Sequence, residues 1–273
     1  MVLAAFRFTF GLLARFSTAA AARLALRIFR TPRRYATPPR ERAAMAGAIP
    51  FDVQLGAKTR IRAWSWGDGP LVILMHGWEG RGSQMSPFAA PLVNAGYRVV
   101  TFDAPGHGAS SGRKSSLPEF SWALRGVATS AGAPHAIIAH SLGCAATTLA
   151  LRDGLGAQRV VFVAPPLEPS AYTEQFGEIF GLEHSVVRGL RERIEERFLR
   201  PWSDYSLAGS APRMKAALLV VHDRDDAEVA YSGGEELAKA WPGARLMTTG
   251  GLGHRRVLRD PDVLNAAVAF ISE

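Results

Sequence analysis

One short stretch constrains this chain more than any other, an apolar run that leads directly into a serine flanked by small residues. It reads Ala-Ile-Ile-Ala-His-Ser-Leu-Gly over residues 136–143. A strand that turns abruptly into a helix must hold its turn residue in a strained conformation, so nothing bulky fits two positions before or after that residue. Ala139 and Gly143 meet this condition around Ser141. We therefore expect a buried strand, a sharp turn and a helix, with the Ser141 hydroxyl raised above the sheet.

Short apolar runs of the same kind recur along the chain and alternate with segments of helical composition. We expect strands at 51–55, 59–66, 71–75, 97–102, 136–140, 160–164, 217–222 and 245–249, the first two forming an antiparallel pair. We expect helices at 86–95, 118–130, 142–153, 234–241 and 261–270. Apolar strands that alternate with helices indicate an α/β fold, with a mostly parallel sheet and helices on both faces. The alternation breaks at about 168–207, where a helical pattern predicts a small lid.

The net charge of +8 is concentrated at one end of the chain. Of the 32 Lys and Arg and the 24 Asp and Glu, residues 1–44 hold nine arginines and one glutamate, so the rest holds 23 of each sign. The body of the protein is therefore formally neutral. A nucleic-acid-binding surface across the body is not supported, because the positive charge is confined to the N-terminal segment.

The first 34 residues alternate apolar clusters with single arginines and contain no acid. At 100° per residue, Arg23, Arg27, Arg30 and Arg34 fall on one face of an amphipathic helix. The arginines interrupt every apolar run well before the roughly 18 to 20 residues that cross a bilayer, so a transmembrane span is not expected. Three interpretations remain open: a helix in the interface of an anionic membrane, a targeting presequence, or a helix packed on its own domain.

We therefore divide the chain into residues 1–44, a basic amphipathic helix and a linker, and residues 45–273, the folded domain. The linker is expected from Arg33 to Arg40, where prolines end the helix. On this division, removal of residues 1–44 should leave the activity of the domain intact. Cys144 is the single cysteine, which excludes an intrachain disulfide and is expected to be a small buried residue. This composition fits a cytoplasmic protein. If the basic helix binds the membrane, the protein would be peripheral to its inner face.

Polar residues follow four of the expected strands. They are His76-Gly77-Trp78, Ser141, the cluster 222–226 and the glycine-rich segment 250–254. The carboxyl ends of strands in such sheets are where functional groups gather. With these motifs in this order, the chain resembles the α/β-hydrolases from about residue 51 to residue 273. The resemblance implies a nucleophile elbow at Ser141 and a general base at His254.

The resemblance also implies an acid that fixes the histidine and two backbone donors that form an oxyanion hole. Asp226 is the preferred acid, Asp225 is the alternative, and Asp223 is expected to cap the turn. The oxyanion donors would be the backbone N–H groups of Trp78 and Leu142. No metal or cofactor is implied.

Three further features accompany this pattern. The turn at residues 103–108 resembles a hallmark of the family, and we interpret it as structural. Ala139 replaces the glycine that is more usual before the elbow, a change that the geometry tolerates. Glu79, beside the expected oxyanion loop, is expected to be solvated.

The sequence thus predicts a serine hydrolase that cleaves a small-molecule ester or thioester through an acyl-enzyme on Ser141. The same residues could also serve acyl transfer, cofactor-free perhydrolysis or C–C bond hydrolysis. From a different class, a non-catalytic binding protein of this fold, tethered by its basic helix, remains open. The lid would shape the acyl pocket, and the sequence does not name the substrate.

Overall fold

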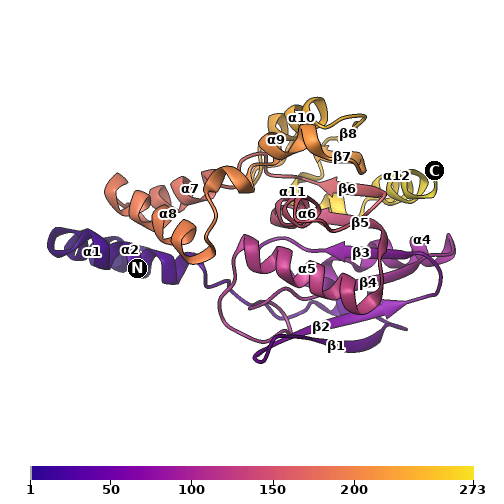
Figure 1. Ribbon diagram of the computed structural model, residues 1–273, viewed down its shortest axis with the longest axis horizontal. Helices are drawn as coiled ribbons and strands as arrows, with labels where there is room; N and C mark the ends of the chain where they lie inside the picture. Colours follow the sequence, from indigo (N-terminus) through magenta and orange to yellow (C-terminus); the bar gives the residue numbers. More distant parts are fainter. Residues whose placement is uncertain (1) are drawn as a thin grey trace.

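The computed structural model describes residues 2–273, and its centre is an eight-stranded sheet (Figure 1). The strands are β1 (Ile49–Leu55), β2 (Thr59–Trp66), β3 (Leu71–Met75), β4 (Arg98–Phe102), β5 (Pro134–His140), β6 (Arg159–Val163), β7 (Ala217–Asp223) and β8 (Arg245–Thr249). Every expected strand is present, and three of them have the predicted bounds. The largest difference at a strand end is two residues, at the starts of β1 and β5.

The strands lie in the order β1-β2-β4-β3-β5-β6-β7-β8. β1 pairs with β2, and β2 with β4, in antiparallel fashion, while every pair from β4 to β8 is parallel. The predicted fold class is therefore confirmed. Because β3 and β5 are adjacent and parallel, with Ile73 opposite Ile137, the segments that follow them emerge side by side at one edge of the sheet.

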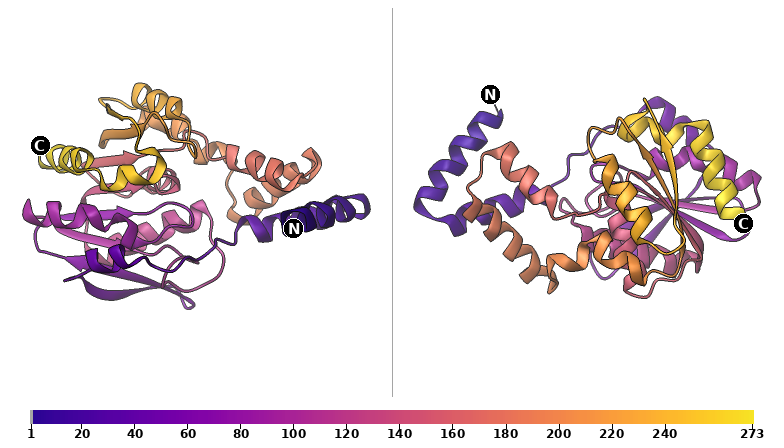
Figure 2. Two further views of the ribbon diagram at one scale, coloured as in Figure 1. Left: turned by 180° about the vertical axis from the view of Figure 1, so that it is seen from behind. Right: turned by 90° about the horizontal axis from the view of Figure 1, so that it is seen from above.

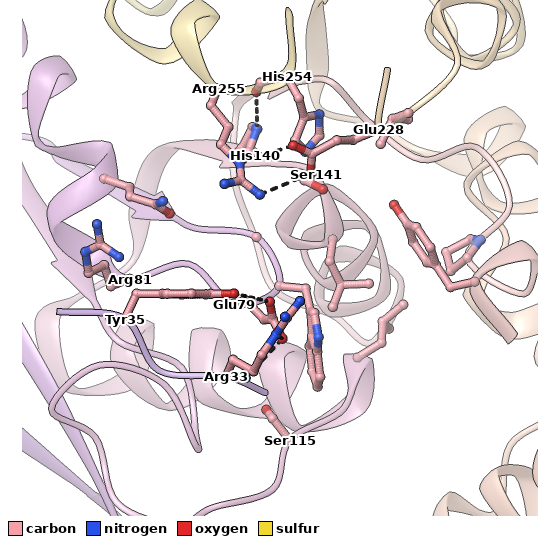
Figure 3. Close-up of a pocket in the computed structure, with 18 of the residues that line it drawn as sticks. Arg33, Tyr35, Glu79, Arg81, Ser115, His140, Ser141, Glu228, His254 and Arg255 are labelled. Atoms are coloured by element: carbon pink, nitrogen blue, oxygen red, sulfur yellow. Dashed lines mark hydrogen bonds and ion pairs between the residues drawn. The ribbon is translucent and has the colours of Figure 1, made fainter. Parts of the chain in front are cut away.

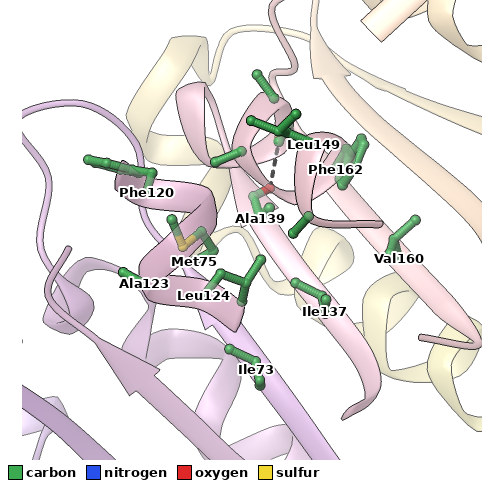
Figure 4. Close-up of a cluster of buried hydrophobic side chains, with 14 of the residues drawn as sticks. Ile73, Met75, Phe120, Ala123, Leu124, Ile137, Ala139, Leu149, Val160 and Phe162 are labelled. Atoms are coloured by element: carbon green, nitrogen blue, oxygen red, sulfur yellow. Dashed lines mark hydrogen bonds between the residues drawn. The ribbon is translucent and has the colours of Figure 1, made fainter. Parts of the chain in front are cut away.

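Helices cover both faces of this sheet. The body contains η1 (Gly82–Phe88), α4 (Ala89–Asn94), α5 (Leu117–Ala131), α6 (Leu142–Arg152), α9 (Leu207–Ser210), η3 (Ala211–Arg213), α10 (Tyr231–Ala240), α11 (Gly253–Arg256), η4 (Val257–Arg259) and α12 (Pro261–Ser272). Side chains alternate between the faces along each central strand, so Ile73 and Met75 join the core under α5 and α6 (Figure 4). Val72 and Leu74 join a second core under η1, α4 and α12.

A group of four helices projects from one end of the body (Figures 1 and 2). Two come from the N-terminus, α1 (Val2–Phe16) and α2 (Thr18–Phe29), and two from the segment between β6 and β7, α7 (Ala171–Phe180) and α8 (His184–Phe198). They share a third apolar cluster, in which Phe10, Ala22 and Leu190 are buried. The short helix η2 (Trp202–Tyr205) leads from α8 back to the body. We call α1, α2, α7 and α8 the helical appendage.

The N-terminal segment differs from the expected single helix and linker. The helix breaks at Ser17, whose hydroxyl caps α2 by accepting from the Ala20 amide. α2 ends at Phe29, because Pro32 disfavours helical backbone in the residue before it. Residues 39–44, expected in the linker region, form the short helix α3 (Pro39–Ala44). Among residues 2–273, no helix is both long and apolar enough to cross a bilayer.

Two of the four arginines expected on one helix face have other roles. Arg30 is buried, and its guanidinium contacts both carboxylate oxygens of Glu119 at 2.9 Å. Arg34 lies beyond the helix and donates to the carbonyl oxygens of Gly106 at 2.9 Å and Ser110 at 2.8 Å. Both guanidinium groups face the body because carbonyl and carboxylate acceptors lie there, although Arg34 itself stays exposed. The first 44 residues are therefore joined to the body rather than separate from it.

Candidate active site

The centre of the site is the turn between β5 and α6. Ser141 has φ 52° and ψ −125°, a region that costs a non-glycine residue about 1 to 3 kcal/mol. The Ser141 amide donates to Val163 O of β6 at 2.9 Å, which fixes the turn against the neighbouring strand. The strained strand-to-helix turn predicted from the sequence is present, and the Ser141 side chain stands at the wall of a cavity.

The loop after β3 passes directly against this turn. A Cβ atom on Gly77 would lie 2.8 Å from the Ser141 Cβ, and one on Gly143 would lie 2.6 Å from the His76 carbonyl oxygen. Only glycine permits so close an approach. Among residues 2–273, the backbone N–H groups of Trp78 and Leu142 have no acceptor within the protein. These two amides, from adjacent segments, are available to an anion beside Ser141.

His254 and Asp226 meet at the same edge of the sheet. His254 Nδ1 lies 2.8 Å from Asp226 Oδ2, and the other carboxylate oxygen accepts from the amides of Glu228 at 2.8 Å and Val229 at 2.9 Å. Burial alone would raise the pKa of Asp226. The hydrogen bonds from His222, His254 and Val229 outweigh burial and hold the Asp226 pKa far below its usual range. Asp226 is therefore an anion that fixes His254 with Nδ1 as donor, which leaves His254 Nε2 as an acceptor.

The two competing aspartates hold the backbone instead. Asp225 accepts from the Gly251 amide at 2.7 Å and does not contact His254. Asp223 accepts from the Asp225 amide at 3.0 Å, as expected for a turn cap, but it also accepts from the Gly253 amide at 2.9 Å. Asp223 therefore ties the end of β7 to the loop that carries His254. The sequence analysis expected Asp223 to cap the turn, but it did not predict the contact of Asp223 with the Gly253 amide.

Two histidines to which the sequence analysis assigned no role support the site. His140 Nε2 lies 2.9 Å from the His254 carbonyl oxygen, and burial lowers the pKa of His140 to about 3. A neutral His140 therefore donates to the backbone of His254 and holds it in place. His222 is fully buried and lies 3.5 Å from Asp226 Oδ2. Its position immediately before Ser141 is the sequence feature that could have marked His140 as a site residue.

The turn at residues 103–108 holds the loop after β3, as its structural interpretation implied. His76 Nε2 accepts from the Ala104 amide at 3.0 Å, and His107 Nε2 accepts from the Glu79 amide at 3.1 Å. Burial lowers the pKa of His76 to about 4 and that of His107 to about 3, so both rings are neutral acceptors at neutral pH.

The expectation that Glu79 is solvated is wrong. Its carboxylate accepts from the backbone amide of Arg33 at 3.0 Å and from Arg33 Nε at 3.1 Å. Only 22% of its side chain is exposed. Arg33 and Glu79 are 46 residues apart, and no sequence motif marks them as partners, so local pattern could not reveal the pair.

A cavity of about 1430 Å³ opens in front of Ser141 and extends beneath the helical appendage. Figure 3 shows Ser141, His140 and His254 together, apart from Glu79, Arg33 and Tyr35, which lie lower in the view. Apolar side chains from three parts of the chain line the cavity, including Leu3, Phe6, Phe29, Trp78, Phe176, Ile179 and Phe180. The N-terminal helices thus form part of the cavity wall.

Tyr172, at the start of α7, also lines the cavity and was not predicted as a site residue. Its phenol lies beside the Ser141 side chain, and burial raises the pKa of Tyr172. Tyr172 is therefore a neutral phenol next to Ser141. Lid sequences follow no fixed motif, so the sequence could not mark Tyr172 as a site residue. Its place beside Ser141 depends on how α7 packs.

Each carboxylate that lines the cavity is matched by an arginine. Glu41 contacts Arg81 at 2.7 Å, and Glu79 contacts Arg33 at 3.1 Å. Glu228 contacts Arg255 at 3.2 Å. Among the described residues, no group of three His, Cys, Asp or Glu is placed to hold a metal ion. The cavity therefore offers apolar surface and a polar centre at Ser141, without a free carboxylate.

Comparison with known proteins agrees with this architecture. The sequence model of the serine aminopeptidase family S33 matches residues 69–198, and that of TAP-like proteins matches residues 203–271. The chain belongs to the α/β-hydrolase superfamily. Its family matches and its site support a role as a hydrolase.

Individual relatives are distant or matched over a short length. A proline iminopeptidase from Pestalotiopsis fici is 44% identical over 61 residues, which is 22% of this chain and only 21% of that protein. The structure of a Pyrococcus furiosus esterase has a TM-score of 0.67 and 17% identity, covering 88% of this chain and 98% of that one. A bacterial membrane phospholipase A has a TM-score of 0.66 and 18% identity, covering 97% of this chain and 98% of that one.

Proposed function

We propose that this protein is a serine hydrolase that cleaves a carboxylic ester or thioester through an acyl-enzyme on Ser141. The observation that carries the proposal is the convergence of Ser141, His254 and Asp226 with two free amides at one sheet edge. This convergence combines a strained nucleophile, a histidine with a free Nε2 and a buried carboxylate anion. A site kept only for binding has no need of all three together.

In the proposed reaction, Ser141 Oγ attacks the acyl carbonyl while His254 Nε2 takes its proton. Asp226 stabilises the imidazolium that forms and keeps Nδ1 as the donor. The amides of Trp78 and Leu142 donate to the oxyanion that develops on the carbonyl oxygen. His254 then returns the proton to the leaving group, and water, activated by the same histidine, releases the acid.

The cavity favours an acyl group that is large and apolar. Its wall is mostly aromatic and aliphatic, and its volume of about 1430 Å³ exceeds what a short acyl group would fill. The likeness in fold to esterases, and to a phospholipase over nearly the whole chain, is compatible with this preference. We therefore propose long-chain acyl esters or thioesters as the substrate class.

Cleavage of an amino-terminal peptide bond is the competing activity, because one family match is to serine aminopeptidases. Such an enzyme must hold the free ammonium group of its substrate, which calls for an unpaired carboxylate. The carboxylates that line the cavity, Glu41, Glu79 and Glu228, are all paired with arginines. This pairing favours the ester over the peptide.

The test combines turnover with active-site labelling. Wild-type protein should hydrolyse p-nitrophenyl esters, faster for long than for short acyl chains, and a fluorophosphonate should label Ser141. Ser141→Ala should lose at least about 10³-fold in kcat/KM, whereas Ser232→Ala, an exposed serine on α10, should retain activity. Absence of a label on Ser141, or full turnover by Ser141→Ala, would overturn the proposal. Faster cleavage of an aminoacyl p-nitroanilide than of any ester would favour the peptidase.

A further inference from the structure

α1 carries two apolar faces, and only one of them is packed. Phe6 and Phe10 contact Phe180 of α7, at ring centroid distances of 5.6 and 6.0 Å. On the other side of the helix, Phe8 is 73% exposed, Leu12 is 49% exposed and Phe16 is 82% exposed. These three residues are spaced four apart, so they form one continuous stripe along the helix. We call Phe8, Leu12 and Phe16 the apolar stripe.

Exposed positive charge accompanies the apolar stripe on the same helical hairpin. Arg15 follows Leu12 by three residues and therefore lies on the same face of α1. Arg23 and Arg27 are exposed on α2, the second helix of the same hairpin. Within the described part of the chain, these three guanidinium groups make no ion pair. The first acid in the sequence is Glu41, which is bound to Arg81.

We propose that the apolar stripe docks on an anionic lipid surface, with α1 lying in the plane of the interface. Exposed phenylalanines with flanking arginines and no acid are the composition that such a surface attracts. α1 has 15 residues, too few to cross a bilayer, which is consistent with an interfacial position. A second copy of the chain is a poorer occupant, because pairing two such faces would bring arginines together with no acid to offset them.

Docking would also place the cavity next to the lipid. Leu3 and Phe6 of α1 line the cavity that leads to Ser141, and Ile179, which lines it too, is 47% exposed. A lipid with an apolar chain could therefore pass from the interface along α1 and α7 into the cavity. This step rests on the proposed function, whereas the docking of the apolar stripe does not.

The experiment is sedimentation of the full-length protein with vesicles, measured without reference to activity. We expect binding to vesicles of phosphatidylcholine and phosphatidylglycerol at low salt, and a marked decrease at about 0.5 M NaCl, where charges are screened within a few ångströms. The variant Phe8→Gln/Phe16→Gln should bind about tenfold or more weakly, because each phenylalanine loses its burial in lipid. Arg15→Gln/Arg23→Gln should weaken binding to anionic vesicles only.

Matched controls distinguish binding through the apolar stripe from nonspecific adsorption to vesicles. Ile49→Gln replaces a residue that is 70% exposed on β1, and Lys215→Gln/Lys239→Gln removes two exposed charges from the body. Both variants should bind vesicles like the wild type. Ser141→Ala should also bind like the wild type, because this binding does not depend on the proposed hydrolase activity. Equal binding by Phe8→Gln/Phe16→Gln and wild type would overturn the proposal. The proposal would also be overturned if the wild type did not bind vesicles and light scattering showed it to be a dimer that Phe8→Gln/Phe16→Gln dissociates.

Discussion

At the scale of single residues, the environment of Ser141 is built from groups with fixed protonation. Asp226 is held as an anion and His140 as a neutral ring. Tyr172 is held as a neutral phenol by burial, which raises its pKa. His254, whose Nδ1 contacts Asp226, keeps its Nε2 free, and this is the nitrogen that takes up the proton in the reaction we propose. The chemistry therefore depends on few atoms, and small changes beside Ser141 should be measurable.

Tyr172→Phe tests the group that only the structure revealed. We expect the tyrosine hydroxyl to orient the Ser141 hydroxyl during turnover, so its removal should lower kcat by about three- to tenfold, the usual range for one hydrogen bond. The KM for a long-chain ester should change little, because the ring that lines the cavity remains. Steady-state kinetics on a p-nitrophenyl ester would measure this effect. An unchanged kcat, with a raised KM, would mean that Tyr172 serves only as part of the wall.

At the scale of elements, the site is a set of loops held by buried histidines. His76 joins the loop after β3 to the turn after β4, and His107 joins the same two segments from the other side. His140 joins the end of β5 to the start of α11. In each case a neutral ring nitrogen contacts a backbone group. Protonation of His76 or His107 would place a donor where an amide already donates, so these loops are sensitive to acid.

Stability should therefore fall as the pH falls from 7 to 5. The pKa values of His76, His107 and His140 in the folded protein are about 4, 3 and 3, against an ordinary value of 6.5. Below pH 6.5 the unfolded chain takes up protons that the folded protein does not, which costs about 1.4 kcal/mol per pH unit for each histidine. Urea unfolding at pH 7, 6 and 5 measures this slope.

The control for this prediction is His107→Gln, which should reduce the slope by about one third because one of three titrating groups is gone. The variant is also expected to be less stable at pH 7, so the comparison is between slopes and not between absolute free energies. A stability that is flat or rising between pH 7 and pH 5 would contradict the assignment of these rings as neutral.

At the scale of the whole molecule, the N-terminal segment is part of the fold. It lines the cavity, and three ion pairs hold it to the body: Arg30 with Glu119, Arg33 with Glu79, and Glu41 with Arg81. α1 and α2 complete the helical appendage with α7 and α8 (Figure 2). The division into a detachable leader and a separate domain therefore does not describe how the chain packs. The lid predicted at about 168–207 contains α7, α8 and η2 and shares its core with the N-terminus.

Deletion of residues 1–44 should consequently abolish activity or solubility, in contrast to the expectation from the sequence. The deletion uncovers the apolar side chains of α8 and leaves Arg81, whose side chain is only 9% exposed, without its partner. Glu41→Gln isolates the second effect and should cost about 3 kcal/mol, as for other buried pairs that lose one member. Thermal unfolding and ester hydrolysis would measure both variants. A fully active, stable truncated protein would show that the segment is dispensable.

The sequence by itself determined the sheet, the elbow and the order of the motifs. Strands buried on both faces are apolar throughout, and a turn as tight as that at Ser141 restricts its neighbours to small residues, so both leave local patterns. Asp226 and His254 could be placed because each follows a strand that had already been located. These features depend on residues close together in the chain.

The tertiary structure alone decided which distant groups meet. The contact of Tyr172 with Ser141, the pairing of Glu79 with Arg33 and the packing of α2 on α8 join segments that are 31, 46 and more than 150 residues apart. No local periodicity encodes such contacts, because many arginines and apolar faces are equally suited to each partner. Their selection depends on how the whole chain packs, and it made the N-terminal segment part of the cavity wall.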